Sequence, residues 1–473
     1  MHWDVRTTGA DTNGGGFDSR VASPGTDFSQ QDGAQVTYVD LVIGGTTTQL
    51  TSVLHPFGST FPGNVINITG GTGCTTGWYE INSVTSTTAT MDRSVGTAAS
   101  VCTGNLGGGF LTFAQATTVW VGGNTIDLKN GTYTFTTRFD FGSDSSGFGW
   151  TIRGYNATHS DDGAPPTITT STNSIHMFGS TTGPRIFLDN LILTNTAGTP
   201  GDGFRPNSQV KLQSRKTSWS GFAWALNGVD TNIFFELLLF QVEVKSSKTG
   251  GIKNEAGGAL RYCYIHDNTG DGVLSASEVN AGNGTMWSLD HSIIVRNTSI
   301  GFESTNSSAA ITIHAINSIV AFNGSDGIKV LSGAMCATCS LNVLVNNVIY
   351  GNTGLGINFP VTQVLLLDNQ NNSYGSNTGG NHTNLPNGTG DVTLTANPFT
   401  DGTGTSGHDN WTLNSTAGGG AALKAVGFPG TFAAGTTTTT GSLDIGVVQS
   451  TCAAPATTSG YTFAALLRRE CAR

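Results

Sequence analysis

The sequence predicts an all-β protein built mainly as a right-handed parallel β-helix, in which short strands wind into stacked coils. Three observations support this prediction. The chain has 473 residues, a length at which one compact core stops growing, whereas a solenoid extends along its axis. It contains 66 glycines and only 11% charged residues, and it has few stretches that favour helices. Its central part carries a degenerate repeat whose period lies in the range typical of β-solenoids.

The repeat consists of a short β run, an asparagine, three further residues, a glycine and an apolar residue. Its clearest copies span residues 263–273, 292–302, 318–328 and 347–357. We expect the asparagines to stack from coil to coil through their side-chain amides, and the glycines to supply a positive φ in the turn. The asparagines are Asn268, Asn297, Asn323 and Asn352, and the glycines are Gly272, Gly301, Gly327 and Gly356, spaced by 29, 26 and 29 residues.

Side-chain alternation along a strand predicts two further ladders beside the glycines. The residue after each glycine is apolar and is expected to point into the core, and the next residue is expected to point outward. Glu303 should then face Lys329 on the next coil. The inward set is Ile252, Val273, Phe302, Ile328 and Ile357, and the outward set is Lys253, Leu274, Glu303, Lys329 and Asn358.

The two ends of the repeat region resemble pectate-lyase-like β-helix proteins. Residues 5–17, continued by residues 107–133, resemble the N-terminal cap of that superfamily, and residues 441–449 resemble its closing segment. The resemblance implies that residues 1–17 and 107–449 form the cap and the β-helix. Residues 18–106 would be an inserted small β domain, an antiparallel barrel or sandwich, because short β runs alternate there with Gly/Thr turns. Residues 450–473 would form a C-terminal tail.

Charge and hydropathy exclude several classes of function. A net charge of −10 and a pI near 5.2 argue against a nucleic-acid binder, which needs a basic surface. No apolar run reaches the ~18 residues of a membrane span. The first residues show no secretory signal pattern.

Seven cysteines leave several pairings open. Cys74 with Cys102, and Cys452 with Cys471, could each close a loop. Cys336 and Cys339 lack the further ligands of a zinc site, so free thiols or a local disulfide are expected there.

Two carboxylates are the first requirement of glycoside hydrolysis, ~5–5.5 Å apart for retention or ~6.5–9.5 Å for inversion. Asp271 and Asp326 hold the same position of the repeat two coils apart, which corresponds to ~9.6 Å at ~4.8 Å per coil. Asp202 is a third such residue. Asp-Gly is also simply a favoured turn pair. We therefore predict no catalytic residues, with Asp271 and Asp326 as the candidates to be tested.

A lyase of the pectate-lyase-like superfamily would need a carboxylate cluster for calcium and a Lys or Arg base on the same face. Lys253, Glu255 and Asp267 are the nearest approximation. His266, His291 and His314 fall at different positions of the repeat, so no shared metal site and no cofactor are expected.

The superfamily contains enzymes as well as virion proteins without activity, so the fold does not decide the function. Without a convincing catalytic set, we predict a non-enzymatic structural or attachment protein on the outside of a tailed-phage virion, either capsid-decorating or tailspike-like. It would be assembled in the host cytoplasm as a homotrimer and would contact capsid or tail proteins and host surface polysaccharide, but neither nucleic acid nor membrane. The alternatives are a polysaccharide-degrading tailspike (glycoside hydrolase or lyase) and a bacterial surface adhesin.

Overall fold

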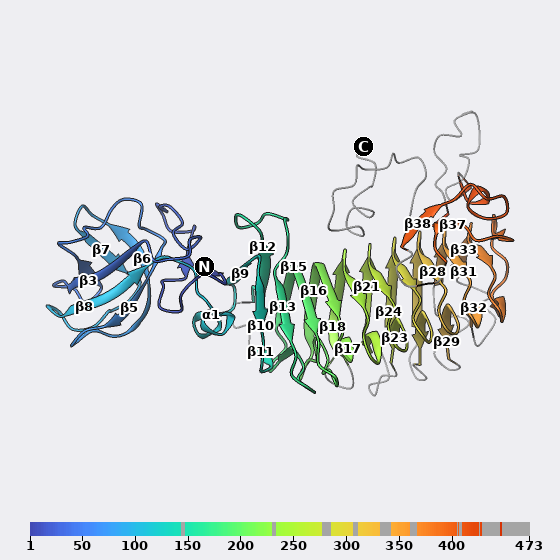
Figure 1. Ribbon diagram of the computed structural model, residues 1–473, viewed down its shortest axis with the longest axis horizontal. Coiled ribbons are helices and arrows are strands. Elements are labelled where there is room, and N and C mark those ends of the chain that lie inside the picture. Colours follow the sequence, from blue (N-terminus) through green and yellow to red (C-terminus); the bar gives the residue numbers. More distant parts are fainter. Residues whose placement is uncertain are drawn as a thin grey trace, which may run out of the picture. The chain divides into compact units, whose positions relative to one another are not determined.

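The computed structural model describes residues 1–142, 147–228, 233–276, 285–305, 311–331, 342–359, 367–403, 405, 409–424, 426–427 and 445–446. The chain divides into two compact units: Met1–Thr134, Ser143–Thr169 and Arg185–Ile192 form the first, and the remaining residues form the second. The predicted fold class is confirmed, because the protein is nearly all-β, with a parallel β-solenoid and a small closed antiparallel barrel near the N-terminus (Figure 1). Among the described residues, no helix is both long and apolar enough to span a membrane.

The barrel of the first unit is closed in the strand order β3-β4-β7-β6-β5-β8. Its core is apolar, and a disulfide joins Cys74 to Cys102. A register shift after Tyr38 breaks the alternation of β3, and β8 contains Gly104 and Asn105, two residue types that are uncommon in strands. The strands are β3 (Val36–Ile43), β4 (Gln49–Thr51), β5 (Val65–Gly70), β6 (Gly77–Val84), β7 (Thr88–Met91) and β8 (Val101–Leu106).

The first unit also contains the split cap. Strand β1 (His2–Val5) pairs antiparallel with β2 (Gly16–Phe17) before the barrel and parallel with β9 (Thr125–Lys129) after it. Helix α1 (Phe113–Val119) begins at Thr112, whose hydroxyl accepts a hydrogen bond from the Gln115 amide. Parallel pairing then continues from β9 to β12 and from β12 to β15, and β10 pairs with β13. The strands are β10 (Thr132–Thr134), β12 (Trp150–Tyr155), β13 (Thr167–Thr170) and β15 (Arg185–Asn195).

The second unit winds three strands per coil into three parallel sheets (Figure 1). Sheet one holds β16 (Val210–Ser220), β18 (Phe234–Phe240), β21 (Gly257–Arg261), β24 (Thr285–Asp290), β27 (Ile311–Ile316), β30 (Asn342–Val345) and β33 (Leu367–Gln370). Sheet two holds β19 (Glu243–Lys245), β22 (Tyr264–His266), β25 (Ile293–Val295), β28 (Ile319–Ala321), β31 (Val348–Tyr350), β34 (Ser373–Gly375) and β36 (Val392–Thr393). Sheet three holds β17 (Trp224–Gly228), β20 (Gly250–Asn254), β23 (Val273–Ser275), β26 (Phe302–Ser304), β29 (Ile328–Val330), β32 (Leu355–Asn358) and β35 (Gly380–Thr383). Strands β11 (Phe139–Phe141) and β14 (Phe178–Ser180) form a separate parallel pair.

Sheet three has the register that the repeat predicts. Ile252, Val273, Phe302, Ile328 and Ile357 pair in sequence from β20 to β32 and are all buried. Their outward neighbours pair in the same order, and Glu303 Oε1 lies 3.2 Å from Lys329 Nζ. Burial of one apolar side chain per coil, stacked along the axis, stabilises each coil against its neighbour.

The asparagines form a buried ladder of amide hydrogen bonds. Asn268 Nδ2 donates to Asn297 Oδ1 at 2.9 Å, and the next two steps, to Asn323 and Asn352, measure 3.0 Å each. Each amide also donates to a backbone carbonyl, for example Asn323 Nδ2 to Ile294 O at 3.2 Å. The polar atoms of these buried side-chain amides thus have hydrogen-bond partners on the adjacent coils.

The expected positive φ at the repeat glycines is wrong. Gly272, Gly301, Gly327 and Gly356 do not have positive φ, and the positive φ falls instead on the residue before each asparagine, for example Arg296 at 55°. The glycines are required by close packing: a Cβ at Gly327 would lie 2.6 Å from the carbonyl oxygen of Gly356 on the next coil. Residues as different as aspartate, arginine and phenylalanine occupy the positive-φ position: Asp267, Arg296 and Phe322.

A second turn ladder, which the sequence analysis missed, lies between sheet one and sheet two. The Ser292 amide donates to Ser318 Oγ at 3.1 Å, and the Ser318 amide donates to Asn347 Oδ1 at 3.0 Å. The residue before each member again has positive φ. The ladder was hidden because its members change in type along the chain: Cys263, Ser292, Ser318, Asn347 and Asn372.

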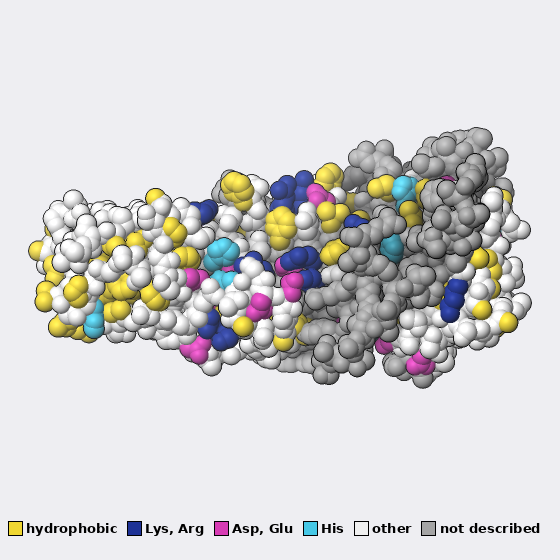
Figure 2. All heavy atoms as spheres, turned by 90° about the horizontal axis from the view of Figure 1, so that it is seen from above, with side chains coloured by type: hydrophobic (Ala, Val, Ile, Leu, Met, Phe, Trp, Pro, Cys, Tyr) yellow, Lys and Arg dark blue, Asp and Glu magenta, His cyan; other side chains and the backbone are white. Residues whose placement is uncertain are grey.

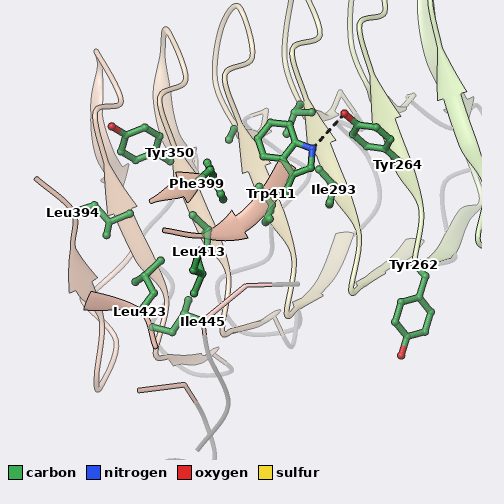
Figure 3. Close-up of a cluster of buried hydrophobic side chains, with 14 residues drawn as sticks. Tyr262, Tyr264, Ile293, Tyr350, Leu394, Phe399, Trp411, Leu413, Leu423 and Ile445 are labelled. Carbon is green, nitrogen blue, oxygen red and sulfur yellow. Dashed lines mark hydrogen bonds between the residues drawn. The ribbon is translucent and has the colours of Figure 1, made fainter. Parts of the chain in front are cut away.

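The outer face of sheet two is covered by the C-terminal part of the chain. Ile293 lies in an apolar cluster with side chains from β37 (Phe399–Asp401) and β38 (Asn410–Leu413) (Figure 3). Ile319 and Val348 belong to the same cluster. A short 3₁₀ helix (Gly420–Ala422) follows. Of the predicted closing segment only residues 445–446 are described, and Ile445 is buried in this cluster. The tail, and with it Cys452 and Cys471, lies outside the described residues, as do Cys336 and Cys339.

Candidate functional site

The candidate aspartates of the repeat hold equivalent places and bind the backbone of the next coil. Asp271 Oδ1 accepts the amide of Ile300 at 3.0 Å, and Asp326 Oδ1 accepts that of Leu355 at 2.7 Å. Asp202 receives the amide of Trp224 in the same way, at 3.1 Å. These carboxylates therefore fix one coil to the next, which is the use that an Asp-Gly turn pair suggests.

One of them also belongs to a carboxylate pair. Glu303 hydrogen-bonds with Asp271, and burial, followed by the charge of Asp271, raises the pKa of Glu303 even though Lys329 opposes this effect. Two close carboxyl groups oppose each other's ionisation, in agreement with the direction of this shift. Glu303 is thus the sequence-predicted outward residue whose pKa is raised, and Asp271 is the carboxyl group beside it.

The suggested lyase set is not assembled in the form expected. Lys253 lies on β20, where its Nζ is 6.0 Å from the ring centroid of Trp224. Glu255 is buried just after that strand. Asp267 occupies the positive-φ turn after β22 and is bound to Arg296 on the next coil, at 2.8 Å and 2.9 Å.

The second unit holds a dense group of ionisable side chains around Arg296. We call it the Arg296 cluster and define it as Glu243, Lys245, Tyr264, His266, Asp267, Arg296 and Asp409. The first four come from β19 and β22, where pairing places Glu243 beside Tyr264 and Lys245 beside His266. Asp267 and Arg296 are positive-φ turn residues of adjacent coils, and Asp409 precedes β38.

Arg296 is the centre of these contacts. Its Nη2 lies 2.8 Å from Asp409 Oδ1 and 3.1 Å from the hydroxyl of Tyr264, in addition to the two bonds to Asp267. Tyr264 donates to the same Asp409 oxygen at 2.5 Å. The side chain of Arg296 is 3% exposed, whereas that of Asp409 is 42% exposed. Asp409 therefore covers a buried cation from the solvent side.

His266 lies between two carboxylates. Its Nδ1 is 2.6 Å from Asp267 Oδ2, its Nε2 is 3.2 Å from Glu243 Oε1, and its ring stacks on that of Tyr264 with centroids 3.7 Å apart. Glu243 also binds Lys245 Nζ at 2.9 Å. The two carboxylates fix the plane of the imidazole and supply an acceptor for either of its protons.

The pKa values of two carboxyl groups of the cluster, those of Glu243 and Asp267, are lowered. Burial opposes ionisation of Glu243, but hydrogen bonding by His266 and the charge of Lys245 prevail and lower its pKa to about 2. The pKa of Asp267 is lowered by Arg296 and His266 against the same effect of burial. Burial, reinforced by the hydrogen bond to Asp409, raises the pKa of Tyr264. The phenol thus keeps its proton while both carboxyl groups have lost theirs.

The Arg296 cluster lies where the outer face of sheet two changes from charged and partly exposed to apolar and covered. From β25 to β31 the outer face is apolar and covered, but Glu243 and Lys245 on β19 are partly exposed. On the face drawn in Figure 2, the coloured basic, acidic and histidine side chains gather in a few small groups. Sequence reasoning missed Tyr264, Glu243 and Arg296, because they hold different positions of the repeat and meet only across coils.

Among the described residues of the first unit, one group could hold a metal. His2, Asp127 and His159 each offer one ligand atom, and these atoms lie within 4.8 Å of one another. Sequence reasoning missed this group, since the three residues are far apart along the chain.

No protein-family model matches the chain, and no curated protein matches it. Among solved structures, pectate lyase Pel9A is 14% identical, with a TM-score of 0.41 over 72% of this chain and 91% of that one. The A-modules of two mannuronan C-5 epimerases from Azotobacter vinelandii are also similar. That of AlgE4 is 13% identical (TM-score 0.35, 59% of this chain and 90% of that one), and that of AlgE6 is 14% identical (0.32, 58% and 91%).

These similarities concern the fold, and they change one expectation. All three proteins are named as enzymes, so the prediction that the chain is not an enzyme is contradicted.

Proposed function

We propose that the protein is an enzyme that acts on a polysaccharide, with proton-transfer chemistry at the Arg296 cluster. The observation that supports this best is the combination, at one place, of a buried cation, a phenol that keeps its proton, and an imidazole held between two ionised carboxylates. Such a set can remove a proton, return one and stabilise an anion.

Each residue has a role that its contacts suggest. His266, held through Nδ1 by Asp267, accepts the proton at Nε2 once the substrate displaces the 3.2 Å contact of Nε2 with Glu243, and Tyr264 is the proton donor. Arg296 binds a carboxylate of the substrate; for an acidic sugar this favours loss of the proton on the adjacent carbon, followed by elimination or by return of a proton to the other face. Hydrolysis fits the cluster less well, because it needs a carboxyl group with a raised pKa, and those of Glu243 and Asp267 are lowered.

The contacts of Asp409 suggest how a substrate would enter. Its carboxylate takes up a donor of Arg296 and the hydroxyl of Tyr264, which are the groups that a substrate carboxylate would bind. As the most exposed acidic member of the network around Arg296, Asp409 is the group that a substrate would replace. Its removal should therefore lower KM.

The test is an assay of the purified chain on acidic and neutral polysaccharides, following unsaturated ends, reducing ends and epimerised sugars separately. We expect H266A and Y264F to lower kcat/KM by about 10²-fold or more, and D409A to lower KM. His382, which bonds to the exposed Asn387, provides the matched control H382A, which should keep full activity. Equal activity of H266A and the wild type would refute the assignment.

A second candidate reaction is glycoside hydrolysis at the pair of Glu303 and Asp271. It is favoured by the raised pKa of Glu303, which is the property required of a general acid. In that case E303Q and D271N would abolish the release of reducing ends, while H266A would leave it unchanged.

The biological setting expected from the sequence stays part of the proposal. The enzyme would be a homotrimer on the outside of a tailed-phage virion, bound to capsid or tail proteins and facing host surface polysaccharide. The acidic, glycine-rich composition of the β-helix and the inserted β domain, which could act as an anchor, support it. Mass spectrometry of purified particles tests it, and absence of the chain from the particles would count against it.

A further inference from the structure

We infer that His2, Asp127 and His159 of the first unit form a binding site for a divalent transition metal, and that zinc fits its donor set. Two histidine nitrogens approach one carboxylate oxygen: Asp127 Oδ2 lies 2.8 Å from His2 Nδ1 and 3.8 Å from His159 Nδ1. A tetrahedral zinc ion with bonds of ~2.0–2.1 Å holds its ligand atoms roughly 3.3 Å apart. The observed separations bracket this value.

The local fold explains why these residues meet. Parallel pairing puts Asp4 of β1, Asp127 of β9 and Arg153 of β12 in one row. His2 lies two residues before Asp4, on the same face of its strand. The chain after β12 then returns over this face and brings His159 to it. The site thus joins three segments that the sequence separates widely, including both parts of the split cap.

The surroundings orient the ligand atoms toward a common point. His159 Nε2 is 2.9 Å from Asp4 Oδ1, which leaves its Nδ1 facing Asp127. Asp127 Oδ1 receives two hydrogen bonds from Arg153, at 2.6 Å and 2.8 Å, which leave Oδ2 for the site. A histidine whose second nitrogen is bound to a carboxylate is the usual arrangement at zinc centres. Asp4 is itself held by Arg6 and by the hydroxyl of Tyr155.

Exposure and remaining coordination are consistent with a site that a metal can enter. Asp127 is fully buried, whereas the side chain of His2 is 37% exposed and gives access from solvent. Three protein ligands leave a fourth position, for water or for a further carboxylate. The nearest additional acidic group is Asp27, whose Oδ2 is 3.8 Å from His159 Nδ1. A bound ion would tie β1 to β9 and to the segment after β12.

The inference is tested on the full chain after chelator treatment and dialysis, with zinc alone as the probe. Calorimetry and elemental analysis should find one zinc ion bound per chain in the wild type. H159Q, which can keep a hydrogen bond to Asp4, should bind zinc at least 10-fold more weakly. H291Q is the matched control and should bind as the wild type does, because His291 also lies beside a carboxylate, Asp290, at 2.6 Å, but belongs to no such group within the described part of the chain.

Two further measures make the result decisive. The same titration in a C336S/C339S background removes thiols that could compete for zinc. Zinc should raise the unfolding temperature of the wild type and leave that of H159Q unchanged. If H159Q does not fold, H2Q decides the question, since His2 is the exposed ligand. Wild-type zinc affinity in the variant that folds, or no zinc bound by the wild type, would overturn the inference.

Discussion

The asparagine ladder gives the sharpest stability prediction, at Asn323. Its side chain is buried and makes four hydrogen bonds. Its amide nitrogen donates to Asn352 Oδ1 and to Ile294 O, at 3.0 Å and 3.2 Å. Its oxygen accepts from the backbone and side-chain nitrogens of Asn297, at 3.2 Å and 3.0 Å. Truncation to alanine therefore affects groups on both neighbouring coils.

The magnitude follows from the groups that N323A leaves unsatisfied. A buried donor or acceptor without a partner costs about 1–3 kcal/mol. With two to three such groups, N323A should lower the free energy of unfolding by roughly 3–6 kcal/mol. The isosteric N323D should be at least as harmful, because a carboxylate cannot donate to Ile294 O or Asn352 Oδ1. The loss should be local, since each coil contacts only its neighbours.

The assay is hydrogen exchange of the β25, β28 and β31 amides, together with urea unfolding of the full chain. Asn130 supplies the control, because its amide also donates to an asparagine, Asn156 Oδ1 at 3.3 Å, but at an exposed position. N130A should change stability by no more than about 0.5 kcal/mol. If N323A and N130A exchange alike, the amide ladder does not hold the coils together and the reasoning is refuted.

Three further outcomes follow from the same structure. G327A should lower the urea midpoint, because the added Cβ would lie 2.6 Å from the Gly356 carbonyl oxygen. G198A, at an open position, should leave the midpoint unchanged. Equal midpoints for the two variants would exclude the packing explanation. Because Trp411 is fully buried, W411A should lower the local free energy of unfolding by about 3–5 kcal/mol and expose the chain around β37 and β38 to limited proteolysis. An unchanged cleavage pattern would contradict the role of the apolar cluster that covers sheet two. The pKa of Glu243 is about 2 in the folded protein and lower than in the unfolded chain, so its stabilising contribution is complete above about pH 4.5 and is lost as the pH falls toward 2. The urea midpoint should therefore differ less between pH 7 and pH 3 in E243Q than in the wild type. An equal difference in the two proteins would show that Glu243 makes no such contribution.

The local turn geometry could not be predicted from residue type. Glycine was expected at the positive-φ position because it accepts that conformation most readily. The fold instead places Asp267, Arg296, Phe322 and Gly351 there, and it uses the repeat glycines where two coils approach closely. Packing against the next coil imposes the φ value. The residue pattern along one coil carries no information about the contacts that the next coil makes with it.

The candidate site was hidden for a related reason. Tyr264 and Glu243 lie on different strands, and Arg296 belongs to a turn one coil further along. Their common location depends on the register between coils and on the C-terminal segment that brings Asp409. The group of His2, Asp127 and His159 likewise depends on a cap whose two parts are interrupted by the barrel.

The sequence by itself determined the parallel β-helix and its asparagine and apolar ladders, because each coil repeats the same alternation and the same buried amide. It also predicted the small β domain near the N-terminus, which is a closed antiparallel barrel. The tertiary structure alone decided which ionisable groups meet. Charged side chains are few and hold no fixed position in the repeat, so only the stacking of coils and the return of the C-terminal segment bring them within hydrogen-bonding distance.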